Sequence, residues 1–211
     1  SARDGYKSWF DLTILVLAHV LLLPLWVLLW IIIPILIRLG DRGPVFYKQD
    51  RVGKGGRIFT VFKFRTMVPD AEDKGAAWTM DQDPRVTKVG KLLRRTALDE
   101  LPEVLNIWKG DMSLVGPRAL DVEEQRSLEK LIDGFEGRLQ VRPGLTGLAQ
   151  VYDSKDDAHE KFHYDLEYLQ RMSPWLDVKL LVLSVRNTLG VKWDRRSGKT
   201  SIANGLSESL P

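Results

Sequence analysis

Apolar residues are concentrated in one long segment near the start of the chain. Residues 12–37 carry no formally charged side chain, and about 26 such residues are enough for a helix that spans a membrane. Pro24 stands near the middle, where a proline removes a backbone hydrogen bond and kinks or breaks a helix. Each half of about 12 residues would rise only ~18 Å, against ~30 Å of hydrocarbon. The segment is therefore either a kinked spanning helix or a re-entrant helix–break–helix, and the pattern leaves both open.

Basic side chains flank both ends of this segment, with Arg3 and Lys7 before it and Arg38 and Arg42 after it. The positive-inside rule places basic flanks on the cytoplasmic side of a membrane. Two basic flanks are what a hairpin with both ends in the cytoplasm would show.

After this segment the pattern of apolar and polar residues changes to that of short strands, as in a folded polar domain. Residues 45–52 and 57–67 read as strands around the glycine-rich turn 53–56, which predicts a β-hairpin. Lys63 and Arg65 fall on one face of the second strand. Side by side they would form either an anion site or the charged edge of a solvated strand.

An acidic pair follows at a predicted helix start. Residues 88–95 predict a short basic helix. Pro102 is tolerated only in a first helical turn, so another helix is expected to begin near Asp99 and to run to about residue 109. There Asp99 and Glu100 lie at the positive end of the helix dipole, which favours ionised carboxylates and attracts phosphate. On position alone, an ordinary capping aspartate with an acidic first turn is the commoner arrangement.

Two loops place an arginine beside glycine and proline. Residues 110–118 contain Arg118, and residues 141–147 contain Arg142. Glycine lets a ligand approach the backbone closely, and a guanidinium group binds phosphate through two parallel hydrogen bonds. Taken singly, each loop also fits a structural turn.

The last apolar stretch, residues 175–193, follows Ser173 and Pro174, which form a good helix start. It is rich in leucine and valine with basic residues interspersed. It predicts either a core helix or an amphipathic helix lying in the membrane interface. Trp175 and Trp193 favour the interface.

His159, Glu160 and His163 form a literal H-E-x-x-H pattern on a predicted helix. In a zinc metalloprotease this spacing supplies two metal ligands and a glutamate base. The chain has only three histidines, His19 lies inside the apolar segment, and Glu167 is one turn further along the same helix. We therefore interpret the pattern as a solvated helix face, with a membrane zinc metalloprotease as the alternative.

Composition excludes several other classes. The absence of cysteine excludes a disulfide scaffold, a thiol nucleophile and cysteine-ligated metals. A net charge of +3 is weak for a nucleic-acid-binding protein and compatible with anionic lipid or phosphorylated substrates.

Six motifs follow one another along the chain, and their order is more specific than any one of them. They are Gln49-x-Arg51-x-Gly53, Phe62-Lys63-Phe64-Arg65-Thr66-Met67, Pro84-Arg85-Val86-Thr87-x-x-Gly90, Leu98-Asp99-Glu100-Leu101-Pro102, Gly110-Asp111-Met112-Ser113-x-Val115-Gly116-Pro117-Arg118, and Arg142-Pro143-Gly144-Leu145-Thr146-Gly147-x-Ala149-Gln150-Val151. With these motifs the chain closely resembles the bacterial sugar transferase family, the small monotopic phosphoglycosyl transferases, from about residue 7 to residue 192.

The resemblance implies a reaction. A sugar-1-phosphate moves from a UDP-sugar to polyprenyl (undecaprenyl) phosphate, giving a polyprenyl diphosphate sugar and UMP. Asp99 matches the family's nucleophile, which forms a covalent aspartyl-phosphosugar in a ping-pong course. Mg²⁺ is expected near Asp99, and Glu100 would orient the metal or assist proton transfer. The basic residues expected to bind the phosphates and the nucleotide are Lys63, Arg65, Arg85, Arg118 and Arg142.

The resemblance also implies a fold and a location. The expected fold is α+β and mostly helical, with a re-entrant membrane helix broken at Pro24, a small β-hairpin and amphipathic interfacial helices. Residues 1–40 would form the membrane hairpin, 41–198 the catalytic domain and 199–211 a disordered tail. The protein would be monotopic on the cytoplasmic face of the bacterial inner membrane. Its partners would be the UDP-sugar, the polyprenyl phosphate and the bilayer, without nucleic acid, and a homodimer is left open.

Two positions depart from the family's pattern. Leu23 precedes Pro24 where relatives often have serine, so this position lacks a hydroxyl that could bond the carbonyls freed by the break. Tyr152-Asp153-Ser154 stands where relatives often have a Gly-Arg pair, so an unusual sugar follows if this loop contacts it. A non-catalytic, membrane-tethered binding protein is the second alternative, and it would show no turnover with any donor.

Overall fold

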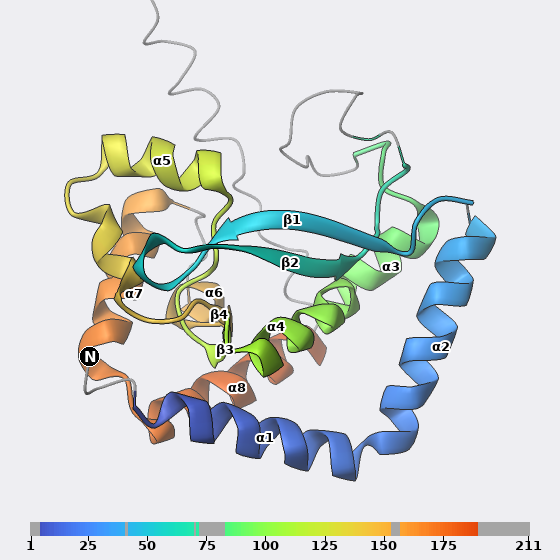
Figure 1. Ribbon diagram of the computed structural model, residues 1–211, viewed down its shortest axis with the longest axis horizontal. Helices are drawn as coiled ribbons and strands as arrows, with labels where there is room; N and C mark the ends of the chain where they lie inside the picture. Colours follow the sequence, from blue (N-terminus) through green and yellow to red (C-terminus); the bar gives the residue numbers. More distant parts are fainter. Residues whose placement is uncertain (1–4, 41, 70, 72–82, 153–156, 190–211) are drawn as a thin grey trace, which may run out of the picture.

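The computed structural model describes residues 5–40, 42–69, 71, 83–152 and 157–189 (Figure 1). The elements in chain order are α1 (Lys7–Leu21), α2 (Leu23–Gly40), β1 (Phe46–Val52), η2 (Lys54–Gly56), β2 (Ile58–Phe64), α3 (Lys88–Arg95), η3 (Leu98–Glu103), α4 (Val104–Lys109), β3 (Ser113–Val115), α5 (Val122–Leu131), η4 (Phe135–Gln140), β4 (Gly144–Thr146), α6 (Leu148–Tyr152), α7 (Ala158–Arg171) and α8 (Pro174–Leu189). The predicted mostly helical α+β fold with a small hairpin is confirmed. The predicted tail, residues 199–211, lies outside the described residues.

The apolar segment forms two helices that meet at a sharp bend, with α1 along the bottom of the view and α2 upright at its right (Figure 1). The break falls at Leu22, just before Pro24, because Pro24 has no N–H to continue the hydrogen bonds of α1. The expectation of two halves of about 12 residues is wrong. α2 has 18 residues and is long and apolar enough to cross a membrane by length and composition. The re-entrant path therefore stays a prediction.

Trp26 holds the two helices together across the bend. Its indole Nε1 donates a hydrogen bond to the Ala18 carbonyl at 3.2 Å, and its ring stacks on His19 with centroids 4.4 Å apart. The indole thus gives a second hydrogen bond to a carbonyl in the last turn of α1, which already accepts one from the Leu22 N–H. Large apolar side chains cover the outer surfaces of both helices, including Val16, Leu17, Val20, Leu21, Leu25, Val27, Leu28, Ile31, Ile35 and Leu39. An exposed apolar surface of this extent is typical of membrane contact.

The β-hairpin crosses the centre of the molecule (Figure 1). β1 and β2 pair antiparallel from Phe46 opposite Phe64 to Val52 opposite Ile58, which confirms the predicted hairpin. The next helix, α3, packs closely on the chain that leaves β2. The approach is so close that a Cβ at Gly90 would lie 1.9 Å from the Thr66 carbonyl oxygen. Only glycine permits this approach.

The acidic pair lies on a different kind of turn from the one predicted. Asp99 and Glu100 belong to the 3₁₀ turn η3, and the α-helix begins only at Val104. Ala97, with φ of 53°, directs the chain into this turn, and Pro102 lies inside it. The tighter winding of a 3₁₀ helix brings side chains three positions apart into line. Glu100 and Glu103 therefore share one side of η3.

The two short strands β3 and β4 pair in parallel and bring the glycine-rich loops together. A Cβ at Gly144 would lie 2.0 Å from the Gly116 backbone nitrogen, so the two segments touch through their backbones. The main core lies around them; its buried members include Phe59, Val61, Val104, Ile107, Met112, Leu114, Val115, Tyr168 and Leu180. The hairpin and β3 therefore share one hydrophobic core, to which Phe59 and Val61 of β2 and Leu114 and Val115 of β3 belong.

The last helix, α8, is predicted correctly in position. Leu176 N–H donates to the Ser173 hydroxyl, as expected of an N-cap serine. Asp177 and Leu180 are buried, while Trp175 and Val182 on the other side are 78% and 62% exposed. The helix is therefore both core and amphipathic, and its place in a membrane interface stays a prediction.

A buried polar cluster joins the start of α1 to α8 and β3. The Lys7 Nζ lies 2.7 Å from the Asp177 Oδ2 and donates to the Val115 carbonyl, with both charged side chains almost fully buried. The hydroxyls of Tyr6 and Tyr168 donate to the same carboxylate at 2.8 and 2.7 Å. The N-terminal end of the apolar segment is therefore anchored directly to the folded body.

Candidate active site

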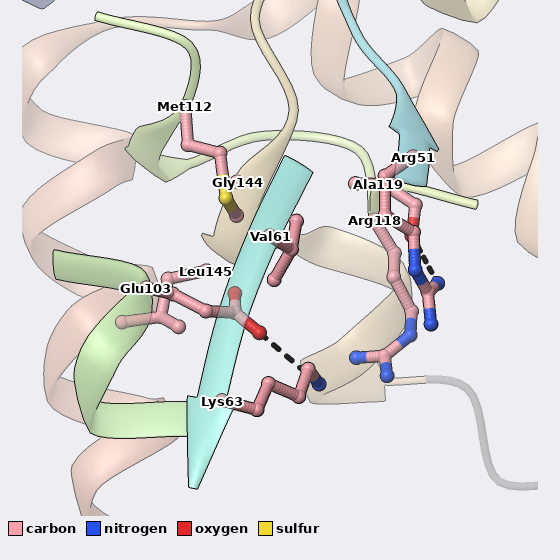
Figure 2. A pocket seen from close by; sticks show the side chains of 9 residues that line it. All are labelled: Arg51, Val61, Lys63, Glu103, Met112, Arg118, Ala119, Gly144 and Leu145. Atoms are coloured by element: carbon pink, nitrogen blue, oxygen red, sulfur yellow. Dashed lines mark hydrogen bonds and ion pairs between the residues drawn. The ribbon is translucent and has the colours of Figure 1, made fainter. Parts of the chain in front are cut away.

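A small pocket lies where the hairpin meets η3, β4 and the chain on either side of β3 (Figure 2). It is lined by Arg51, Val61, Lys63, Glu103, Met112, Arg118, Ala119, Gly144 and Leu145. The enclosed space is only about 10 Å³, roughly the room of one water molecule. A nucleotide-sized ligand would therefore lie across its mouth rather than inside it.

Lys63 is the centre of the charge cluster in this pocket. Its Nζ lies 2.8 Å from the Glu100 Oε1 and 3.0 Å from the Glu103 Oε1. The Arg118 guanidinium approaches the same Glu100 oxygen at 3.7 Å. Residues from β2, η3 and the loop after β3 thus form one network, in which a cation is held between two carboxylates.

The two glutamates of the network differ in their pKa values. Burial alone would raise the pKa of Glu100, but the charges of Lys63 and Arg118 outweigh it and lower that pKa to about 2. The pKa of Glu103 is raised, first by burial and then by the charge of Glu100. Glu100 therefore carries a firmly fixed negative charge at neutral pH.

Asp99 lies on the same turn, outside the lining of the pocket but within electrostatic reach of it. Burial and the charge of Glu100 raise its pKa, while the charges of Lys63 and Arg94 partly offset them. Asp99 lies on a 3₁₀ turn and not at the start of an α-helix, and burial and Glu100 outweigh the backbone hydrogen bond that favours its ionised form. A carboxylate whose charge is poorly compensated is a good electron-pair donor, and such groups gather at functional sites.

Among the other predicted cations, Arg118 lines the pocket, while Arg85 and Arg65 have different surroundings. Arg85 binds the Asp83 carboxylate, with its Nη2 2.7 Å from Oδ2. Arg65 is buried against the backbone of Gly43, where a Cβ would lie 2.1 Å from its Nη1. Arg65 does not line the pocket that contains Lys63, and the anion site, which the strand pattern gave as one of two alternatives, stays a prediction.

Arg142 points toward the membrane segment. Its Nη2 lies 3.2 Å from the Ser8 hydroxyl and 3.5 Å from the Asp11 Oδ2. Asp11 also accepts hydrogen bonds from the Ser113 hydroxyl and the Leu114 N–H. In this conformation Arg142 joins α1 to β3, and its predicted role in phosphate binding stays a prediction.

No site role was assigned to Arg51, Arg94 or Glu103 from the sequence, although Arg51 belongs to the first motif. The signal for Arg51 was the strand pairing, because the register places Arg51 opposite Phe59, on the same face as Val61 and Lys63. Arg94, at the end of α3, donates from its Nε to the Thr66 hydroxyl and lies within electrostatic reach of Asp99. These links depend on the register of the hairpin and on contacts of η3 that no local pattern contains.

The donor set near Asp99 fits a divalent cation shared with a substrate. Within the described ranges, no group of three or more histidine, aspartate or glutamate side chains is placed to hold a metal alone. Glu100 and Glu103 are engaged by Lys63, whereas the charge on Asp99 is poorly compensated. Mg²⁺ is commonly held by one or two carboxylates together with substrate phosphates, and Asp99 suits that arrangement.

The H-E-x-x-H pattern lies on α7, as predicted. His159 and His163 are both exposed, and the helix buries Phe162, Asp165 and Tyr168 instead. Asp165 is engaged by Arg138 at 2.8 Å. The contacts of α7 thus support the interpretation of a solvated histidine face.

Comparison with known proteins gives one consistent match. A family model described as bacterial sugar transferase matches residues 2–190. The chain is 41% identical over 182 residues to a UDP-N-acetylgalactosamine-undecaprenyl-phosphate N-acetylgalactosaminephosphotransferase of Aeromonas hydrophila, covering 82% of this chain and 42% of that protein. It is 40% identical over 184 residues to a UDP-glucose:undecaprenyl-phosphate glucose-1-phosphate transferase of Xanthomonas campestris pv. campestris, covering 84% of this chain and 38% of that one. An uncharacterized sugar transferase, EpsL, of Bacillus subtilis is 42% identical over 154 residues, covering 72% of this chain and 74% of the relative. The chain spans about two-fifths of the length of the first two relatives.

Proposed function

The chain belongs to the bacterial sugar transferase family, and on this premise we propose that it transfers a sugar-1-phosphate from a UDP-sugar to undecaprenyl phosphate. The products are UMP and a polyprenyl diphosphate sugar, the first membrane-bound intermediate of glycoconjugate or polysaccharide assembly. The observation that carries the proposal is the arrangement on η3, where a poorly compensated Asp99 lies beside a network of cations. Relatives are named for different sugars, so the sugar is left open.

The proposed mechanism has two displacements at one phosphorus. A carboxylate oxygen of Asp99 attacks the sugar-bearing phosphorus, the bond to the bridging anhydride oxygen breaks, and UMP leaves. A phosphate oxygen of the lipid then attacks the same phosphorus, and the bond to Asp99 breaks, which restores the carboxylate. Protons and electron pairs balance without any further reactant.

The basic residues of the pocket have a definite task in this mechanism. A carboxylate and a diphosphate are both anions and repel one another, so the approach of Asp99 needs positive charge nearby. Lys63 and Arg118 supply it, and Glu100 fixes their positions through its ion pairs at 2.8 and 3.7 Å. Asp99 would also hold Mg²⁺, which neutralises charge on the phosphate oxygens.

A donor panel tests the proposed function directly. UMP release from several UDP-sugars, with undecaprenyl phosphate as acceptor, is expected for one donor or a few related ones. Omitting the lipid should limit UMP release to one equivalent per enzyme, because the covalent intermediate then accumulates. Absence of UMP release with every donor would favour the non-catalytic binding protein instead.

We predict that changing both His159 and His163 to alanine keeps turnover within about twofold, since exposed substitutions away from a site have small effects. Zinc content by mass spectrometry should stay below stoichiometric in both proteins. A zinc metalloprotease would behave in the opposite way. It would hold one zinc per chain, and the double variant would lose both the zinc and any peptidase activity.

We also propose that α1 and α2 enter and leave the membrane on the cytoplasmic side. Two contacts support this. Lys7 at the start of α1 is ion-paired to Asp177 of the body. At the end of α2, Ile33 and Ile37 are buried in a cluster with Phe64 of the hairpin. Both ends of the segment therefore pack on the same body, whereas a spanning helix would separate them.

Single cysteines test this topology without interference, because the chain has none. Gly5→Cys and Glu123→Cys place one probe before α1 and one on α5, both at exposed positions. In intact bacteria, a membrane-impermeant maleimide is expected to label neither, and after permeabilisation it should label both. Labelling of position 5 alone in intact cells would show that the segment spans the membrane.

A further inference from the structure

Arg51 is a pocket residue that the proposed mechanism has not used. It lies on β1, and its Nη1 donates to the Ala119 carbonyl at 2.7 Å. Its Nε and Nη2 donate to the Gln49 Oε1 at 3.2 and 2.6 Å. A guanidinium has five N–H groups, so one N–H on each terminal nitrogen is not engaged by these bonds. Figure 2 shows the nitrogen ends of Arg51 and Arg118 directed toward the same side of the pocket.

The carboxylates around Arg51 lie farther away than those around Lys63: Glu124, Asp121 and Glu103 act on its charge only through space. Within the part of the chain that the structure describes, Arg51 forms no ion pair, whereas Lys63 is held between two glutamates. Burial and the nearby charge of Arg118 lower the pKa of Arg51. Among the ion pairs of the described residues, the two guanidinium groups take part only in the one between Arg118 and Glu100 at 3.7 Å. Their remaining N–H groups suit the double negative charge of a phosphate monoester.

We infer that Arg51 binds, together with Arg118, the phosphate that departs as UMP and afterwards the phosphate of the lipid acceptor. This inference rests on the proposed function and assigns one phosphate subsite to both substrates. Gln49 and the Ala119 carbonyl hold the Arg51 guanidinium in place, so its remaining N–H groups stay directed at the pocket.

The chemistry of displacement explains why one subsite serves two ligands. In an in-line displacement the attacking and leaving oxygens lie on opposite sides of the phosphorus. UMP therefore leaves from the side opposite Asp99. In the second displacement Asp99 is itself the leaving group, so the lipid phosphate must attack from that same opposite side. A cation pair at this place stabilises the phosphate that departs and then positions the phosphate that attacks.

A purely structural role for Arg51 makes a different prediction. Arg51 also attaches the loop of Arg118 to β1, next to the hydrogen bond from Val52 N–H to the Leu120 carbonyl at 2.9 Å. Loss of this attachment alone would disturb the fold and would weaken every ligand to a similar degree. A direct phosphate contact instead weakens only ligands that carry the phosphate.

The experiment compares Arg51→Gln with Arg57→Gln, a control that removes the same charge from an exposed position of the same hairpin. Titration calorimetry of the full chain in detergent gives the Kd for UMP and for uridine. We expect Arg51→Gln to weaken UMP by about tenfold or more and to leave uridine unchanged, because a charge-assisted contact is lost. Arg57→Gln should change neither. Equal weakening of both ligands, or no change for UMP, overturns the inference.

The half-reactions test whether the subsite is shared. With UDP-sugar alone, intact mass follows formation of the phosphosugar adduct, and a chase with undecaprenyl phosphate follows its decay. Both rates are expected to fall by about tenfold or more in Arg51→Gln. A fall in adduct formation alone overturns sharing. If wild type binds UMP but forms no adduct, the covalent mechanism fails, whereas normal adducts in both proteins refute only the role of Arg51.

Thermal unfolding guards against misfolding of the variant. If the unfolding temperature of Arg51→Gln falls below that of wild type by more than the unfolding temperature of Arg57→Gln does, Arg51→Lys is used in its place. Lysine keeps the charge but not the planar fork, so UMP affinity is expected to fall less than in the glutamine variant, again with uridine unchanged. Weakening of uridine together with UMP in Arg51→Lys would show that Arg51 acts only on the fold.

Discussion

Asp99→Asn is expected to reduce turnover by at least about 10³-fold, because the amide cannot attack phosphorus and no other group replaces it. The fold should remain, since Asp99 forms no ion pair among those of the described residues. Intact-mass analysis with UDP-sugar alone should show a phosphosugar adduct on wild type and none on the variant.

Asp133→Asn is the matched control, because it makes the same change at an exposed position, and it should turn over like wild type. Glu100→Gln is expected to impair both half-reactions severely, since it removes the charge that fixes Lys63 and Arg118. An adduct on Asp99→Asn would show that another residue is the nucleophile, and Glu100 would be the next to examine.

Features that depend on neighbouring residues were predictable from the sequence. The hairpin followed from a glycine turn between two alternating runs, and the structure places it at residues 46–64. The helix break was placed correctly near Pro24 because a missing N–H acts locally. The start of α8 followed from Ser173, because an N-cap hydroxyl also acts locally, on the N–H three residues later. Each of these signals lies within one turn of the feature that it predicts.

Features that depend on distant contacts were not predictable. Position in the motifs suggested that Arg142 binds phosphate, but here it contacts Asp11 of the membrane segment, far from it in the sequence. Arg51 reaches the pocket only through the register of β1 on β2. The pKa of Asp99 is governed by burial and by Glu100 rather than by a helix dipole. Such properties arise from packing between elements, which a single sequence does not specify.

The second large effect concerns stability. Lys7→Met is expected to lower the free energy of unfolding by about 3–5 kcal/mol, because it leaves the Asp177 carboxylate buried without its cation. Asp177→Asn should cost a similar amount by leaving Lys7 buried and charged. Lys179→Met, an exposed change on the same helix α8, is the control and should cost little. Unfolding of the detergent-solubilised proteins by heat or denaturant measures these differences.

Combining Lys7→Met with Asp177→Asn separates the ion pair from ordinary packing. The asparagine Oδ1 can still accept from one of the two tyrosine hydroxyls, its amide NH2 can donate to the other, and no charge is left buried. The double variant is therefore expected to be more stable than the sum of the single losses predicts, by about 2 kcal/mol or more. Simple additivity would mean that the two side chains contribute independently. Lys7 also donates to the Val115 carbonyl of β3. That bond is lost both in Lys7→Met and in the double variant, so a strong coupling would report the pairing of Lys7 with Asp177 and not this second contact.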